Sequence, residues 1–161
     1  MSRNKLPYRE TTDTFLLYKG QIVAQDRGHY VMFPGGGLDK GESAAQAAKR
    51  ECMEEVGSKI KGKLTEITKV DWNWFPAWAN NPKRKKRYKQ FRGERVYFVI
   101  GSVDKFEKPT NADNDAWSGK KLMSISKCIQ LVEKYAKKDH VNTYPYRVGQ
   151  LAILNMLKAL T

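Results

Sequence analysis

The feature of the sequence that most constrains the fold is a run of three glycines, Gly35 to Gly37, between a short apolar segment and a helix. The segment Tyr30 to Phe33 has the composition of a short strand. After the glycines, Ser43 and Gln46 have the spacing of a capping box, and Gly57 stands where a C-terminal glycine cap belongs. The sequence therefore predicts a strand, a glycine turn and a helix that ends before Gly57.

The remaining periodic segments predict an α/β fold. Strands are expected over residues 14–18, 21–24, about 64–71, 95–100 and 122–125, and helices from Ser126 to about Lys138 and from Tyr144 to Leu160. The last helix is apolar enough to predict burial on most sides. Such an order of elements indicates a mixed β-sheet between helices. We expect one domain over 1–161, with an aromatic and basic insertion near 72–92.

The charge of the chain limits the partners that it attracts. Lysine and arginine number 30 against 17 acidic residues, a net charge of +13, which favours nucleotides, RNA or other polyanions. A basic protein without a polymer partner is an equal alternative. Two cysteines, Cys52 and Cys128, predict no disulfide framework and so a reducing, cytoplasmic setting. We expect no membrane span and no secretory signal, and either a monomer or a homodimer.

Three glutamates share one face of the predicted helix. Glu51, Glu54 and Glu55 stand at i, i+3 and i+4, where like charges repel. A divalent cation would compensate them, and an all-carboxylate set suits Mg²⁺ or Mn²⁺ rather than zinc. The alternative is a solvated acidic face paired with Lys49 and Arg50.

The glycine turn does not have the composition of a Walker phosphate loop. Gly41 is followed by Glu42, where such a loop requires lysine and then serine or threonine. An acid at that place repels phosphate unless a metal intervenes. The sequence therefore indicates phosphate held through a metal ion.

This segment resembles the Nudix box, G-x5-E-x7-R-E-U-x-E-E-x-G-U, in which U is a bulky aliphatic residue. The fixed positions are filled by Gly36, Glu42, Arg50, Glu51, Glu54, Glu55 and Gly57. Cys52 is an apolar substitute at the first U. Ser58 departs from the pattern at the second, where we expect Ile60 to compensate in packing. The resemblance implies a Nudix-type α/β/α sandwich.

The resemblance also implies an activity, hydrolysis of a nucleoside diphosphate linked to another group, with Mg²⁺ or Mn²⁺. The catalytic residues that it implies are Glu51, Arg50 and Glu54. The implied metal ligands are Glu51, Glu54, Glu55, Glu42 and the backbone carbonyl of Gly35. Glu51 is either a ligand or the base that activates water, and Arg50 holds it in position.

Many members of this family use a further acid outside the box. The candidates are Glu94, Asp113 and Asp115. Glu94 stands between Arg92 and Arg95, so a plain salt bridge is its alternative role. The two aspartates are in a polar segment, and solvation is theirs.

Aromatic and basic residues between 72 and 92 suggest where a substrate binds. Aromatic rings stack on bases and cations follow phosphates, which makes Trp78, Lys83, Arg84 and Arg87 candidate substrate contacts, with RNA a candidate partner of segment 83–89. The alternative places the aromatic residues in the core and the cations in a solvated loop; for Trp72 and Trp74 we expect the core.

Free nucleotides are the first expected substrates. An RNA 5′ end, as in decapping, is the second, and a non-catalytic nucleotide- or RNA-binding protein is the third interpretation.

Overall fold

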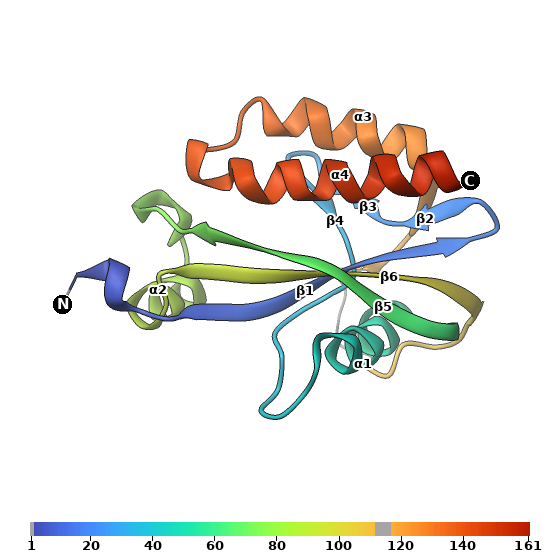
Figure 1. Cartoon of the computed structure of the whole chain (residues 1–161), viewed down its shortest axis with the longest axis horizontal. Coiled ribbons are helices and arrows are strands. Elements are labelled where there is room, and N and C mark those ends of the chain that lie inside the picture. The colour runs from blue at the N-terminus through green and yellow to red at the C-terminus, as the bar shows by residue number, and fades with distance from the viewer. Residues whose placement is uncertain (1, 112–116) are drawn as a thin grey trace.

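The computed structural model describes residues 2–111 and 117–161, and these form a five-stranded sheet with helices on both faces (Figure 1). In spatial order the strands are β5 (Ser58–Asn73), β6 (Gly93–Phe106), β1 (Tyr8–Tyr18), β2 (Gln21–Val23) and β7 (Leu122–Ser124). Strands β1 and β6 run parallel, and the other neighbours are antiparallel. A separate ribbon joins β3 (Gln25–Asp26) to β4 (Val31–Met32). The predicted mixed sheet between helices is confirmed.

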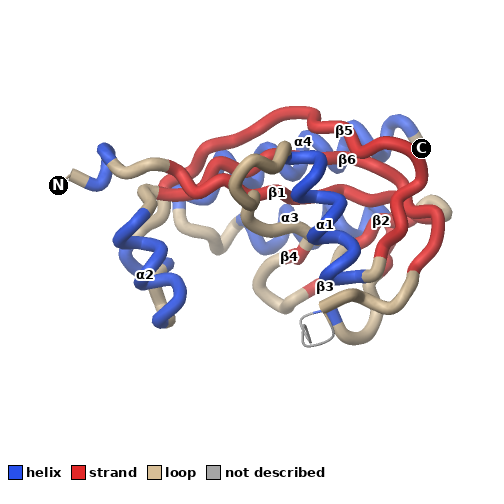
Figure 2. Tube along the Cα trace, turned by 90° about the horizontal axis from the view of Figure 1, so that it is seen from below, coloured by secondary structure: helices blue, strands red, loops and turns tan. Residues whose placement is uncertain are grey.

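The helices form the outer layers. Helix α1 (Ala44–Val56) covers one face of the sheet, and α3 (Ile125–Ala136) and α4 (Tyr144–Leu160) cover the other (Figure 1). Helix α2 (Pro82–Gln90) lies at one end, beside the start of β1, as the view from below shows (Figure 2). Short 3-10 turns are η1 (Arg3–Lys5), η2 (Pro76–Trp78) and η4 (Val141–Thr143).

The core has two parts because strand side chains alternate between the faces of the sheet. Phe15 and Phe98 belong to the apolar cluster beneath α3 and α4. Their neighbours Leu16 and Val99 belong to the cluster beneath α1, together with Cys52. All five are fully buried, as is Cys128 on α3, so both cysteines are core residues, as expected. The central strands are thereby packed on both of their faces.

Several expectations about the elements were wrong. Ser124 rather than Ser126 caps α3, with its hydroxyl accepting the Lys127 N–H at 3.1 Å. Helix α4 is buried along one side only, since Val148 is 45% and Leu160 75% exposed. The basic segment expected as a loop is helix α2, begun by the Asn81 cap, and strands β1, β5 and β6 are longer than expected. No helix in the described ranges has the length and apolar character of a membrane span.

Candidate active site

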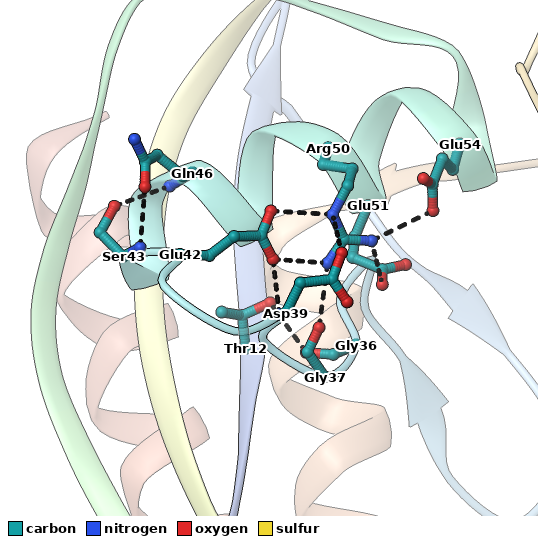
Figure 3. Close-up of polar contacts among 10 residues, drawn as sticks. All are labelled: Thr12, Gly36, Gly37, Asp39, Glu42, Ser43, Gln46, Arg50, Glu51 and Glu54. Carbon is teal, nitrogen blue, oxygen red and sulfur yellow. Dashed lines mark hydrogen bonds and ion pairs between the residues drawn. The ribbon is translucent and has the colours of Figure 1, made fainter.

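The glycine run lies along β1 as a backbone partner. The N–H of Thr12 donates to the carbonyl oxygen of Gly36 at 2.9 Å (Figure 3). A Cβ on Gly35 would lie 1.9 Å from the Thr12 carbonyl oxygen, so only glycine permits this approach. The carbonyl of Gly35 itself has no hydrogen-bond partner among the described residues, which leaves it open to a ligand.

Helix α1 is capped at both ends, as predicted. The Ser43 hydroxyl accepts the Gln46 N–H at 3.1 Å, and the Gln46 side chain accepts the Ser43 N–H at 2.9 Å (Figure 3). Gly57 ends the helix with φ 65°, in the left-handed region that favours glycine. The face of α1 that packs on the sheet is Ala44, Ala47, Ala48, Cys52 and Val56. With its ends and this face fixed, α1 holds its glutamates at defined places beside the glycine loop.

Arg50 lies at the centre of the acidic side chains (Figure 3). Its Nε and Nη2 donate to the two carboxylate oxygens of Glu42 at 2.9 and 2.8 Å. Its Nη1 donates to Glu51 at 2.9 Å and to Glu54 at 3.3 Å, and Nη2 also donates to the Gly37 carbonyl oxygen at 3.0 Å. The bidentate pairing holds the pKa of Glu42 down at about 2. One guanidinium thus offsets the repulsion among several carboxylates and orients Glu51.

The carboxyl of Glu55 is enclosed between two donors. Its Oε1 accepts the Gly35 N–H at 2.9 Å, and its Oε2 accepts the indole N–H of Trp117 at 2.9 Å. Burial raises the pKa of Glu55 to about 7 in spite of both bonds, and burial also raises the pKa of Glu51. A Cβ on Gly36 would lie 2.6 Å from the Glu51 carboxyl, so that carboxyl lies directly against the loop.

Trp117 was not expected at this site. Its ring is only 6% exposed and packs in the cluster beneath α1. The sequence carries little sign of its role, because a lone tryptophan after a polar segment has no motif around it. Its contact with Glu55 joins positions 62 residues apart, which only the fold brings together.

The donor set of the cluster suits a hard divalent cation. Glu51, Glu54 and Glu55 supply carboxylate oxygens, and the glycine loop beside them adds the unpartnered Gly35 carbonyl. In the described parts of the chain, no three acidic, histidine or cysteine side chains already form a cage for an ion, because Arg50 and Trp117 engage these carboxylates. The residues therefore fit such an ion in chemistry, and the side chains would turn from these partners to bind it.

Of the three acids considered outside the box, Glu94 is the one that the structure describes. It stands opposite Arg9 in the parallel pairing of β1 and β6, and their side chains form an ion pair at 4.0 Å. Burial raises the pKa of Glu94 to about 7, and Arg9 opposes this rise. The expected salt bridge is therefore present, but with Arg9 rather than with Arg92 or Arg95. The candidates Asp113 and Asp115 fall outside the described residues.

A large cavity of about 1010 Å³ lies between the end of the sheet, α2 and the start of α4. Three of the candidate substrate contacts, Trp78, Arg84 and Arg87, line it, whereas Lys83 is exposed elsewhere on α2. Glu94 lines the same cavity. Trp72 and Trp74 are buried, 7% and 3% exposed, which confirms the expected core packing, although Trp72 also forms part of the cavity wall.

Arg9 joins this cavity to the acidic cluster. It lines a smaller cavity of about 380 Å³ together with Gly37 and Glu42. Burial and the charge of Arg87 lower the pKa of Arg9, while Glu94 and Glu51 oppose this. The charge of Arg9 therefore interacts with Glu51 of α1 and with Glu94 and Arg87 of the large cavity.

Solved structures with a similar fold superpose on this chain. An ADP compounds hydrolase superposes with a TM-score of 0.56 at 18% identity, over 97% of this chain and 76% of that one. The dihydroneopterin triphosphate pyrophosphohydrolase of E. coli gives 0.54 at 15% identity, over 78% and 88% of the two chains. At such identity these likenesses establish the fold alone, a Nudix-type α/β/α sandwich.

The family is established by sequence. The model described as NUDIX domain matches residues 7–145. The chain belongs to the NUDIX family. It is 33% identical over 104 residues to nucleoside triphosphatase NudI of Escherichia coli, covering 61% of this chain and 63% of that protein. It is 47% identical over 36 residues to Nudix hydrolase 17, mitochondrial, of Arabidopsis thaliana, covering 22% and 20%. The chain thus spans about a fifth of one relative and just under two thirds of the other.

Proposed function

We propose that this protein is a divalent-metal-dependent pyrophosphohydrolase that cleaves a phosphoanhydride bond in a nucleoside diphosphate linked to another group. The observation that carries the proposal is the array of Glu42, Glu51, Glu54 and Glu55 around Arg50, beside the open carbonyl of Gly35. Relatives and neighbours described as a nucleoside triphosphatase and an ADP compounds hydrolase support the substrate class. The buried, unpaired cysteines agree with a cytoplasmic setting.

The proposal gives each residue a role. Glu51, Glu54 and Glu55, with the Gly35 carbonyl, would hold a Mg²⁺ or Mn²⁺ ion, and Glu42 would support them through Arg50. When bound, such an ion neutralises phosphoryl charge and lowers the pKa of water. Glu51, oriented by Arg50, is placed to accept a proton from the attacking water, and Glu94 is the described candidate for a further acid. The chain acts as a single domain in which segment 72–92 serves the substrate.

A hydrolysis screen with metal tests the proposal. The panel contains nucleoside triphosphates, dinucleoside polyphosphates, nucleotide sugars and coenzymes, with Mg²⁺ or Mn²⁺. Glu51→Gln and Glu54→Gln are expected to lower kcat by about 100-fold or more, since each removes a charge from the reacting centre. Glu133→Gln makes the same chemical change at an exposed position of α3 and is the matched control. Activity that survives unchanged in both site variants would refute the assigned centre.

A second candidate substrate is the 5′ end of an RNA, and helix α2 favours it. Six of its nine residues are lysine or arginine and none is acidic. No carboxylate in the described ranges forms an ion pair within 4 Å with any of these cations. Because Arg84 and Arg87 line the large cavity, a strand that left this cavity would meet the outer cations of the helix.

Charge removal on α2 separates the two substrate classes. The triple change of Lys83, Lys85 and Lys86 to alanine is expected to weaken binding of a 5′-triphosphorylated RNA and to lower its salt slope by about 0.7 for each phosphate that the helix no longer neutralises. Hydrolysis of free nucleotides should change little. Removing Lys59, Lys61 and Lys63, exposed lysines of β5, is the control with equal charge. An unchanged slope in the α2 variant would exclude RNA as a partner of this helix.

A further inference from the structure

A partly buried carboxylate on the far face of the sheet is held in one orientation by a chain of side chains. Asp13 of β1 lines the large cavity, and its Oδ2 accepts the hydroxyl of Tyr146 at 2.5 Å and the amide N–H of Gln150 at 2.9 Å. Gln150, itself fully buried, accepts from Arg147 at 2.9 Å, and Arg147 donates to Asp139 at 2.7 Å. This chain fixes which oxygen of Asp13 faces the protein.

The other oxygen of Asp13 is free to serve a ligand. Among the residues that the structure describes, Oδ1 has no hydrogen-bond partner. Burial raises the pKa of Asp13, whereas the bonds from Tyr146 and Gln150 and the charge of Arg147 lower it. A carboxyl oriented by two donors on one oxygen, with the second oxygen beside an open cavity, has the form of a recognition group rather than of a structural bridge.

The wall of the cavity beside Asp13 contains an aromatic pair next to a second carboxylate, Glu94. Trp72 is 7% exposed, and its indole N–H is buried without a hydrogen-bond partner in the described part of the chain. The N–H lies near enough to Glu94 to lower that residue's pKa, yet it does not reach bonding geometry. The Trp72 ring stacks on Tyr146, with centroids 5.8 Å apart and planes 6° apart. Trp72, Tyr146 and Glu94 therefore form one connected part of the cavity wall, close to Asp13.

We propose that this cavity binds the nucleoside part of the substrate and that Asp13 selects the base by accepting a hydrogen bond from it at Oδ1. The rings of Trp72, Phe75 and Trp78, each stacked on a neighbouring ring, give the cavity an apolar wall for a base, and Arg84 and Arg87 line the same cavity for the adjoining phosphates. Arg9 links the cavity to the carboxylates of α1, so one extended nucleotide spans both places. This inference rests on the proposed function, because it takes the ligand to be that nucleotide.

The network predicts an unusual effect for Asp13→Asn. Tyr146 and Gln150 both donate to Oδ2, so the amide oxygen of the asparagine takes that position and keeps both bonds. The amide NH₂ then replaces Oδ1, and the cavity presents a donor where it had an acceptor. The preferred base should lose affinity by about 10- to 100-fold, and bases with an acceptor at that point should gain relative to it. The order of preference among bases therefore changes, and not only its strength.

Binding of reaction products without metal tests the inference apart from catalysis. Calorimetry in EDTA compares GMP, AMP, CMP and UMP with ribose 5-phosphate on the whole protein. The wild type is expected to bind at least one nucleotide about 10-fold more tightly than ribose 5-phosphate, and Asp13→Asn to reorder the four bases. Asp104→Asn, an equal change at an exposed site on β6, should leave the order as it is. Tyr146→Phe, which keeps the ring and removes one bond to Asp13, should weaken discrimination without removing binding.

Two results would overturn the inference. Equal affinity for ribose 5-phosphate and all four nucleotides would mean that the cavity does not bind a base. A uniform loss across the four bases in a folded Asp13→Asn variant, judged by circular dichroism, would mean that Asp13 supports the wall without reading the base. Because neither measurement needs turnover, a protein that binds bases selectively but hydrolyses none of the substrate panel would refute the proposed activity and leave the base site standing.

Discussion

The stability of the metal-free protein is expected to fall with rising pH because an acid of the candidate metal cluster is enclosed. Glu55 has its pKa raised from 4.5 to about 7, chiefly because it is buried. The native state therefore holds a proton that the unfolded chain has already lost between these pH values, and stability falls as pH rises through them. At about 1.4 kcal/mol for each pH unit, the loss is at most about 3 kcal/mol. Glutamine has no proton to lose in this range, so Glu55→Gln should not show this pH-dependent loss, although its NH₂ cannot accept one of the two bonds from Gly35 and Trp117.

Urea unfolding in EDTA from pH 4.5 to pH 8 measures the effect. Between pH 4.5 and pH 8 the free energy of unfolding of the wild type should fall by about 3 kcal/mol more than that of Glu55→Gln, whatever constant difference the lost bond leaves between the two curves. The exposed change Glu133→Gln should run parallel to the wild type throughout. Added Mg²⁺ should reduce the loss of stability of the wild type at pH 8, because an ion bound by the carboxylate stabilises only the wild type fully.

The reasoning about Glu55 fails on a clear result. If the two curves run parallel over the whole pH range, the carboxyl is not protonated in the native state, and burial does not dominate over its donors Gly35 and Trp117. A constant offset between the curves would report only the bond that glutamine cannot accept. Parallel curves would also mean that the acidic face of α1 is stable without a cation.

Three further changes test the packing around the site. Arg50→Ala should lower the free energy of unfolding by about 2 kcal/mol in EDTA at pH 7, because Glu42, Glu51 and Glu54 lose their common partner. Urea unfolding measures this loss, and added Mg²⁺ should reverse it. An unchanged free energy of unfolding would contradict the central role of Arg50. Ser58→Ala should raise the free energy of unfolding by about 1 kcal/mol in the same assay, because the Ser58 hydroxyl is buried without a hydrogen-bond partner in the described residues. An equal or lower free energy of unfolding would mean that the buried hydroxyl does not destabilise the protein. Gly57→Ala should lower the melting temperature by several degrees, since its φ is 65° and a Cβ would lie 1.9 Å from a backbone oxygen; an unchanged melting temperature would show that the loop gives way freely.

The sequence predicted the acidic helix well because its determinants are local. The cap at Ser43, the stop at Gly57 and the shared face of the glutamates follow from spacing within one helix, and the structure contains all three. Ser58 deviates from the bulky residue of the box and is buried. Ile60 packs against the apolar cluster beneath α1, as expected from its place two residues later. Such features need no knowledge of the rest of the chain.

Other parts could not be predicted because they depend on distant contacts. Helix α2 has almost no apolar face, so periodicity gives no sign of it, and its cap at Asn81 and the proline that follows are its only signals. The bond from Trp117 to Glu55 and the bonds of Asp13 to α4 join positions between 62 and 137 residues apart. No spacing rule reaches across such separations.

The two acidic places of the molecule differ in how their charge is offset, and this difference separates their proposed tasks. On α1, Arg50 engages Glu42, Glu51 and Glu54 at an open surface, where an ion can compete for the same oxygens. At Asp13, neutral donors from α4 bind one oxygen only, so a neutral donor on a ligand suffices for the other. The first arrangement suits a cation and the phosphates that it attracts, and the second suits the edge of a base. Arg9, whose pKa reflects both Glu51 of α1 and Glu94 of the large cavity, is where the charged and the neutral parts of one substrate would meet.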